Sequence, residues 1–203
     1  DVWAAGEAGS SLGFETTRLY DELTPVEESV YATLAKEGIS GGRKMLKALR
    51  EPQERAIQCI DLMMSAEKDQ QAIDELYNDD MVRYVWLDAM TNILCPACKL
   101  WNTGHGVNMM REAVSMMGGY GITEDCPGFL FQKWTDGQLE ATYEGPEVVQ
   151  RRHISVTMNN PVFLKQIDLW CKTLRELDQR HPEMGAAALA AGFEMWKWTR
   201  EWL

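Results

Sequence analysis

Glu144 is a lone carboxylate that stands directly before Gly145-Pro146. Proline is favoured in the first turn of a helix, because its missing N–H would have no partner there anyway. The apolar residues after Pro146 have helical spacing, so Glu144 is predicted at a helix N-terminus, beside unpaired backbone N–H groups. Such groups can stabilise a developing oxyanion, and a carboxylate beside them can act as a general base. The alternative is a solvated carboxylate that only favours the helix N-terminus.

Two adjacent glycines, Gly118 and Gly119, form a second feature with chemical potential. Without a Cβ atom, the backbone there can adopt a positive φ and approach a phosphate group closely. The alternative is a plain helix C-cap, where glycine is equally favoured. Either interpretation places the end of a helix at this point.

These features, taken in order along the chain, resemble the C-terminal domain of the flavin-dependent acyl-CoA dehydrogenases. In that family a helix ends in Gly-Gly-x-Gly, a loop with an Asp follows, and Tyr-Glu-Gly opens the last helix before Gln-Arg. The matching residues are Lys99, Gly118-Gly119-Tyr120-Gly121, Asp136, Tyr143-Glu144-Gly145 and Gln150-Arg151. The opening DVWAAGEAGSSLGF is also similar to the second helix of the family's four-helix bundle.

The resemblance implies oxidation of an acyl-CoA thioester, with Glu144 taking the α-proton while the β-hydrogen leaves as hydride to FAD. It also implies that the Glu144 backbone N–H, together with a flavin ribityl hydroxyl, binds the thioester oxygen. The implied cofactor contacts are Ser115, Gly118, Gly119, Gly145 and Pro146, and the implied substrate contacts are Tyr143, Glu144 and Gly145. Ser115 stands where the family has Gln, and Pro146 stands where it usually has Thr.

Further expectations follow from the same resemblance. Electrons are expected to pass to an electron-transfer flavoprotein, and the protein is expected to be a homo-oligomer, dimer or tetramer, in which Gly118-Gly119 contacts a neighbouring subunit's FAD. YEGPEVVQRR is similar to a branch from anaerobic bacteria that acts on aryl- or branched-succinyl thioesters. The family's N-terminal helical domain and β-domain have no counterpart here, so the chain is interpreted as a piece of a longer one that is inactive alone.

The composition excludes several classes of protein. The 203 residues carry a net charge of −11, which argues against nucleic acid and anionic membrane surfaces as partners. No apolar run reaches membrane-spanning length, and no signal peptide is visible. Five cysteines, an odd number, favour reduced thiols in a cytosol-like compartment; they are Cys59, Cys95, Cys98, Cys126 and Cys171. Together with the resemblance to a bacterial branch, this implies a bacterial cytoplasm.

Helical periodicity dominates, so we predict an all-α fold built as a helical bundle. We expect a bundle domain over 1–158 with an insertion at 24–78, and additional helices over 159–203. Thr24-Pro25 and Pro96 are predicted to stop and to bend helices, respectively, and Asn78-Asp79-Asp80 to cap one. The predicted helices are 2–23, 26–36, 43–49, 52–77, 80–117, 146–158, 161–180 and 184–202, with a glycine-rich loop over 118–141.

Two other functions remain open. Cys95-Pro96-Ala97-Cys98 has the spacing of a dithiol redox motif or of half a zinc site. No second cysteine pair exists and the three histidines are scattered, so buried free thiols are the better interpretation and no metal is expected. The other possibility is a catalytically silent helical module that serves interaction or oligomerisation. The tryptophans near the C-terminus are interpreted as core or subunit contacts.

Overall fold

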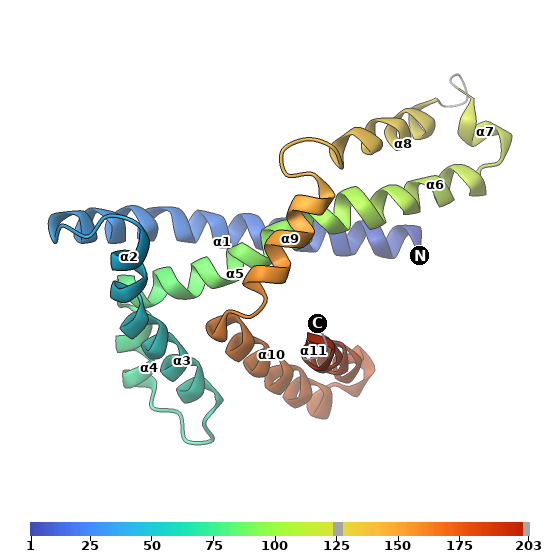
Figure 1. Ribbon diagram of the computed structural model, residues 1–203. Coiled ribbons are helices and arrows are strands. Elements are labelled where there is room, and N and C mark those ends of the chain that lie inside the picture. Colours follow the sequence, from blue (N-terminus) through green and yellow to red (C-terminus); the bar gives the residue numbers. More distant parts are fainter. Residues whose placement is uncertain (124–127, 201–203) are drawn as a thin grey trace. The chain divides into compact units, whose positions relative to one another are not determined.

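The computed structural model describes residues 1–123 and 128–200, and within them every regular element is helical (Figure 1). The predicted all-α fold is therefore confirmed. No helix of the described residues is both long and apolar enough to cross a membrane. The helices are α1 Val2–Lys36, α2 Gly42–Ala48, α3 Arg50–Met64, α4 Gln70–Tyr77, α5 Asp80–Leu100, a π-helical segment Trp101–Gly106, α6 Val107–Met116, α7 Gly119–Ile122, α8 Phe129–Glu140, α9 Glu147–Thr157, α10 Pro161–Arg180, a 3-10 turn Pro182–Met184 and α11 Ala186–Arg200.

The chain forms two compact units. The first combines Asp1–Asp21 with Met90–Thr157, and the second combines Glu22–Ala89 with Met158–Leu203. Every residue that sequence analysis linked to catalysis or cofactor binding falls within the first unit. The predicted family domain over 1–158 follows other boundaries and stays a prediction.

In the first unit, α1 approaches the π-helical segment, which connects α5 directly to α6. The indole Nε1 of Trp101 donates to the Ala5 carbonyl at 3.1 Å. A Cβ atom on Gly9 would lie only 2.4 Å from Oδ1 of Asn102, so any larger residue there would force the Asn102 side chain to shift. A π-helical turn is uncommon and often marks a functional region.

Pro96 lies inside α5, and its neighbours compensate for its missing N–H. A proline in a helix leaves the carbonyl four residues earlier without its usual donor. Here that carbonyl belongs to Asn92, and it accepts a hydrogen bond of 3.2 Å from the Thr157 hydroxyl. The end of α9 thereby supports α5 close to the residues of interest.

One prediction about the first helix was wrong, because α1 continues through Pro25 to Lys36. The apolar residues Leu23, Val26, Val30 and Leu34 keep helical spacing across the proline, and all are buried. Burying such a side chain contributes about 1.5–3 kcal/mol. Several of them together outweigh the cost of about 3 kcal/mol for a proline inside a helix.

The predicted helix over 52–77 is two helices, α3 and α4. Ser65 is extended after α3, and the Asp69 carboxylate caps α4 by accepting the Ala72 N–H at 3.1 Å. The predicted cap before α5 is confirmed at Asp79, whose Oδ1 accepts the N–H groups of Met81 and Val82 at 2.9 and 3.2 Å.

The predicted glycine-rich loop over 118–141 was also wrong, because most of its second half forms α8. Gly128, with φ of 81°, precedes this helix. Gly137 lies within it, and a Cβ atom there would come 2.9 Å from Cγ2 of Val107 in α6. This glycine therefore allows α6 and α8 to pack closely and does not mark a turn.

The second unit has a closely packed apolar core. α10 packs against both α3 and α11, and Ile60, Val162 and Ile167 are at most 1% exposed. Trp196 meets Phe163 edge to face, with ring centres 5.8 Å apart, as expected for a core tryptophan. Trp198 is exposed, and Trp202 lies outside the described residues.

Candidate active site

The predicted catalytic residue lies in a short loop, residues 141–146, between α8 and α9 (Figure 1). The Thr142 backbone N–H and hydroxyl both donate to the Leu139 carbonyl, at 2.9 and 2.7 Å. At the other end, the Glu147 N–H donates to the Ala141 carbonyl at 3.3 Å. The loop is therefore a closed turn held at both ends by its own backbone.

Glu144 has an unusual backbone conformation within this turn. Its φ is 42°, the single positive value among the non-glycine residues that the structure describes. A non-glycine residue in the left-handed region carries strain that the surroundings must stabilise, and such residues cluster at functional sites. The side chain is exposed, and α9 begins at Glu147, one residue after the start predicted from the sequence.

Gly145 also has a backbone conformation that favours glycine. Its φ is 81°, and a Cβ atom there would overlap the Gln150 side-chain nitrogen at 2.0 Å. The glycine thus allows Gln150, from the first turns of α9, to fold back against the loop. This contact connects the Tyr-Glu-Gly and Gln-Arg parts of the sequence pattern.

Lys99 holds the loop from α5, and sequence analysis had assigned it no role. Its ammonium donates to the carbonyl oxygens of Tyr143 at 2.6 Å and Glu144 at 2.9 Å. It also lies 5.3 Å from the centre of the Tyr143 ring, within range of a cation–π interaction. One side chain therefore contacts two consecutive residues of the candidate site.

Tyr143 is exposed and interacts with a carboxylate. Its hydroxyl donates to Glu140 at 2.6 Å, and this hydrogen bond raises the pKa of Tyr143 above its usual value. The Tyr143 side chain therefore contacts Glu140 through its hydroxyl and Lys99 through its ring.

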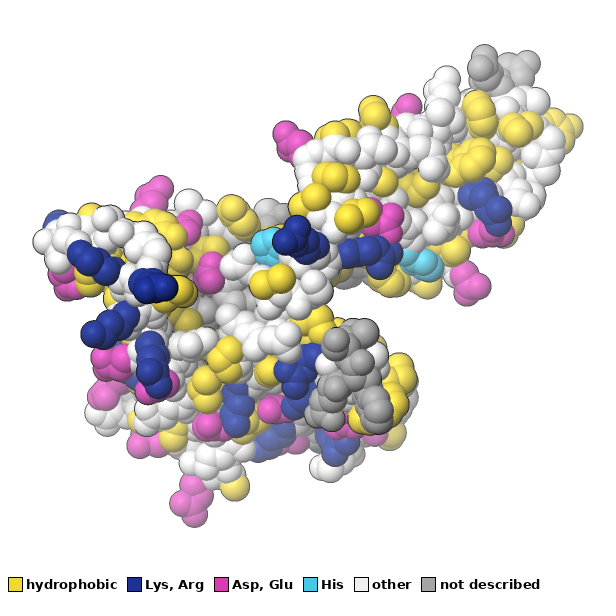
Figure 2. Space-filling model, viewed as in Figure 1, with side chains coloured by type: hydrophobic (Ala, Val, Ile, Leu, Met, Phe, Trp, Pro, Cys, Tyr) yellow, Lys and Arg dark blue, Asp and Glu magenta, His cyan; other side chains and the backbone are white. Residues whose placement is uncertain are grey.

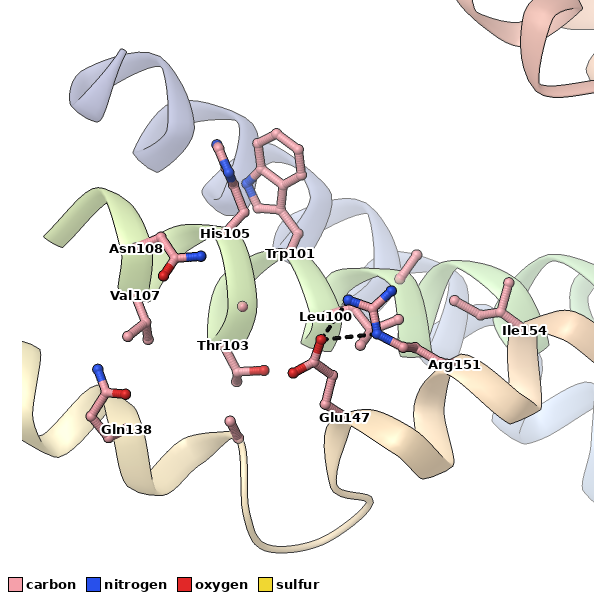
Figure 3. Close-up of a pocket in the computed structure, with 13 residues that line it drawn as sticks. Leu100, Trp101, Thr103, His105, Val107, Asn108, Gln138, Glu147, Arg151 and Ile154 are labelled. Atoms are coloured by element: carbon pink, nitrogen blue, oxygen red, sulfur yellow. Dashed lines mark hydrogen bonds and ion pairs between the residues drawn. The ribbon is translucent and has the colours of Figure 1, made fainter. Parts of the chain in front are cut away.

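A cavity of about 610 Å³ opens beside this loop (Figure 3). Thr103 and His105 come from the π-helical segment, Asn108 comes from α6, and Gln138 comes from α8. The Arg151 Nε donates to Glu147 at 2.9 Å within α9, on the cavity wall. The sequence pattern pointed only to Arg151 among these polar side chains. The others share no motif and meet only when the helices pack, so they were not found from the sequence.

The predicted cofactor residues Ser115, Gly118 and Gly119 lie apart from Glu144. Ser115 lies in the last turn of α6 and the two glycines follow it, whereas the Glu144 loop lies at the opposite end of α8 (Figure 1). A helix of α8's length spans about 18 Å. Within one chain, the two groups of predicted contacts are therefore not brought together.

The local structure at the diglycine leaves its backbone accessible. Gly118 has φ of 58° at the end of α6, and a Cβ atom on either glycine would meet nothing within 4 Å. Ser115 is exposed on α6. Asp136 is exposed in α8, and not in a loop as predicted.

The Cys95–Cys98 pair gives little support to redox chemistry. Both thiols are free and half-buried in α5. Burial, reinforced by Cys98, raises the pKa of the Cys95 thiol, whereas a reactive thiol needs a lowered pKa. No group of three or more His, Cys, Asp or Glu side chains within 1–123 and 128–200 is arranged to hold a metal ion. Cys126 lies outside the described residues.

Comparison with known proteins gives one match. Residues 75–158 match the family model described as acyl-CoA dehydrogenase, C-terminal domain. No curated protein and no solved structure matches the chain. The matched segment contains Lys99, the diglycine and the complete Glu144 loop.

Proposed function

Because residues 75–158 belong to the acyl-CoA dehydrogenase C-terminal domain family, we propose that Glu144 is the catalytic base of a flavin-dependent acyl-CoA dehydrogenase. The observation that carries this proposal is the loop geometry. A carboxylate and an available backbone N–H belong to the same residue, in a strained conformation that Lys99 supports. This combination suits removal of a proton next to a carbonyl group.

The chemistry requires two C–H bonds of the thioester to break as a C=C bond forms. The Glu144 carboxylate takes the α-proton, and the Glu144 N–H stabilises the negative charge that develops on the thioester oxygen. FAD, when bound, supplies the acceptor for the β-hydride. Electrons then pass to an electron-transfer flavoprotein.

The residues present are compatible with FAD at two places. The exposed backbone of Gly118 and Gly119 allows a flavin's phosphates to approach, with Ser115 beside it. Gly145 and Pro146, directly after Glu144, form the other place. The two places are separated by the length of α8. This separation supports a shared site, in which the diglycine of one subunit contacts the flavin that is used by Glu144 of another subunit.

Exposed apolar side chains support a homo-oligomer. Figure 2 shows hydrophobic side chains over the region where α6, α7 and α8 meet. Met116, Tyr120 and Phe129 in this region are 80%, 67% and 59% exposed. Clusters of this kind usually mark contact with another protein. A dimer or tetramer would cover these side chains. We place the protein in the bacterial cytoplasm, where its thiols would stay reduced.

The substrate class follows the YEGPEVVQRR variant of the motif, for which we propose aryl- or branched-succinyl thioesters. The test is to express the enzyme that contains this chain and to follow the flavin absorbance during titration with candidate acyl-CoAs. Bleaching by one class, lost in Glu144→Gln, supports the proposal. A protein that purifies without bound flavin and does not bind acyl-CoA would instead be a catalytically silent helical module.

A further inference from the structure

We infer that Lys99 is a positioning residue, which orients the Glu144 backbone N–H toward the thioester oxygen by holding the carbonyl group at the other end of the same peptide bond. This inference rests on the proposed function of Glu144. Lys99 itself touches neither reacting atom, and its effect passes through the backbone.

The first step in the argument is peptide geometry. The Tyr143 carbonyl and the Glu144 N–H belong to one planar peptide unit, in which they point in opposite directions. The Lys99 ammonium lies 2.6 Å from the Tyr143 oxygen. A charge-assisted hydrogen bond at one end of the unit therefore fixes the direction of the N–H at the other end.

The second step is the additional contact with Glu144. The same ammonium donates to the Glu144 carbonyl at 2.9 Å, and that carbonyl belongs to the next peptide unit. Both peptide planes around the Glu144 Cα are thereby held. This explains how the residue keeps φ at 42° in an exposed turn, where a strained conformation would otherwise relax.

The third step concerns the donor itself. Across residues 1–123 and 128–200, no acceptor within the chain takes the Glu144 N–H, so the N–H is available to a ligand. A positive charge on the carbonyl side of a peptide polarises the amide and strengthens its N–H as a donor. Lys99 thus orients and strengthens the donor together.

The position of Lys99 is itself supported by local contacts. Lys99 lies in the last turn of α5, and its own backbone carbonyl accepts the Thr103 hydroxyl at 2.9 Å. Lysine carries three donors, and here two reach carbonyl oxygens while the charge lies near the Tyr143 ring. The ammonium is therefore committed to the backbone of the loop through two of its three donors.

The test uses Lys99→Met, which keeps an unbranched side chain and high helix propensity. Lys133→Met is the matched control, since Lys133 is an exposed lysine of α8 in the same unit. In the 203-residue chain, NMR order parameters of the Glu144 and Gly145 amides should fall in Lys99→Met from about 0.85 to below about 0.6. The control should keep the wild-type values, and α9 should stay rigid in both.

In the intact enzyme, Lys99→Met should lower kcat about 10²–10³-fold, the usual effect of losing one oxyanion donor. KM should change much less, because the substrate's other contacts remain. Lys99→Arg should recover part of the rate, since a guanidinium also donates to carbonyl oxygens. A rigid loop or an unchanged kcat in Lys99→Met would overturn the inference. Retained turnover in Glu144→Gln would instead overturn the proposed function, so the two failures are distinguishable.

Discussion

The two units of this chain differ in how they are stabilised. The second has a closed apolar core, with Ile60, Val162 and Ile167 buried by α3, α10 and neighbouring helices. The first, which carries the candidate site, exposes large apolar side chains such as Trp3 and Phe14, which are 78% and 79% exposed. Its loop is held by polar contacts from Lys99. The second unit also exposes some apolar side chains, such as Leu46 and Trp198. The comparison indicates that the second unit is stabilised mainly by its buried apolar core, whereas the candidate-site loop of the first unit depends on polar contacts with Lys99.

The largest expected effect tests the chemistry assigned to the first unit. Glu144→Gln in the intact enzyme should lower the rate of flavin reduction at least about 10²–10⁴-fold, because an amide accepts no proton at neutral pH. The exposed position predicts an unchanged fold. Stopped-flow absorbance measures the rate, and circular dichroism checks the helices. Near-normal reduction would remove Glu144 as the base.

The difference between local and tertiary contacts explains which features could be predicted from the sequence alone. The all-α fold and the motif around Glu144 could be predicted, because helical periodicity and turn signals are local. The path of α1 through Pro25 and the helical state of α8 could not, since burial of Val30 and the close approach at Gly137 are tertiary effects. The role of Lys99 was hidden for the same reason, as it bonds to Tyr143 across 44 positions of sequence.

A pair of substitutions tests the difference in packing between the two units. Ile167→Ala, in α10 of the second unit, should lower the free energy of unfolding by about 2–5 kcal/mol through the cavity it leaves. Phe14→Ala removes a larger side chain from the first unit, yet should change stability by less than about 0.5 kcal/mol in the isolated chain. Urea titrations measure both. A large loss for Phe14→Ala would mean that this side chain is already covered in solution.

In the homo-oligomer proposed above, the difference in packing between the two units should become smaller. If Phe14 lies at a subunit contact, Phe14→Ala should weaken association there while leaving the isolated chain unaffected. Sedimentation of both forms at several protein concentrations separates the two effects. Equal association of wild type and variant would place the oligomer contact elsewhere in the first unit, for example over Met116 and Phe129.

A pH titration tests the electrostatics of the second unit at Asp79. Burial would raise the pKa of this carboxyl, but hydrogen bonds from the Arg55 side chain, 2.6 Å away, and from the Val82 and Met81 N–H groups lower it overall. A lowered folded-state pKa gives stability that is present above the unfolded value of about 3.9 and is lost as pH falls through the folded value. Asp79→Ala should lose the cap, costing about 1 kcal/mol at pH 7.

The Asp79 control is Asp79→Asn, which keeps a side-chain oxygen for the cap but carries no charge. Stability of the wild type should fall more steeply below about pH 4 than that of Asp79→Asn. Thermal unfolding of the two proteins between pH 7 and pH 3 measures this difference. Parallel curves would show that the ion pair with Arg55 adds no pH-dependent stability.

The smallest expected effect concerns Cys95 and Cys98, which test whether the first unit holds a second chemistry. Since burial raises the pKa of the Cys95 thiol, the reduced, protonated form should persist at neutral pH. Cys95→Ala with Cys98→Ala should therefore leave flavin reduction by acyl-CoA within about twofold of wild type, while removing some packing in α5. Thiol titration before and after mild oxidation provides the complementary measurement. The dithiol would be functional if a folded double variant lost flavin reduction completely and the wild type formed a reversible Cys95–Cys98 disulfide. In that case α5 would carry redox residues in addition to its structural role.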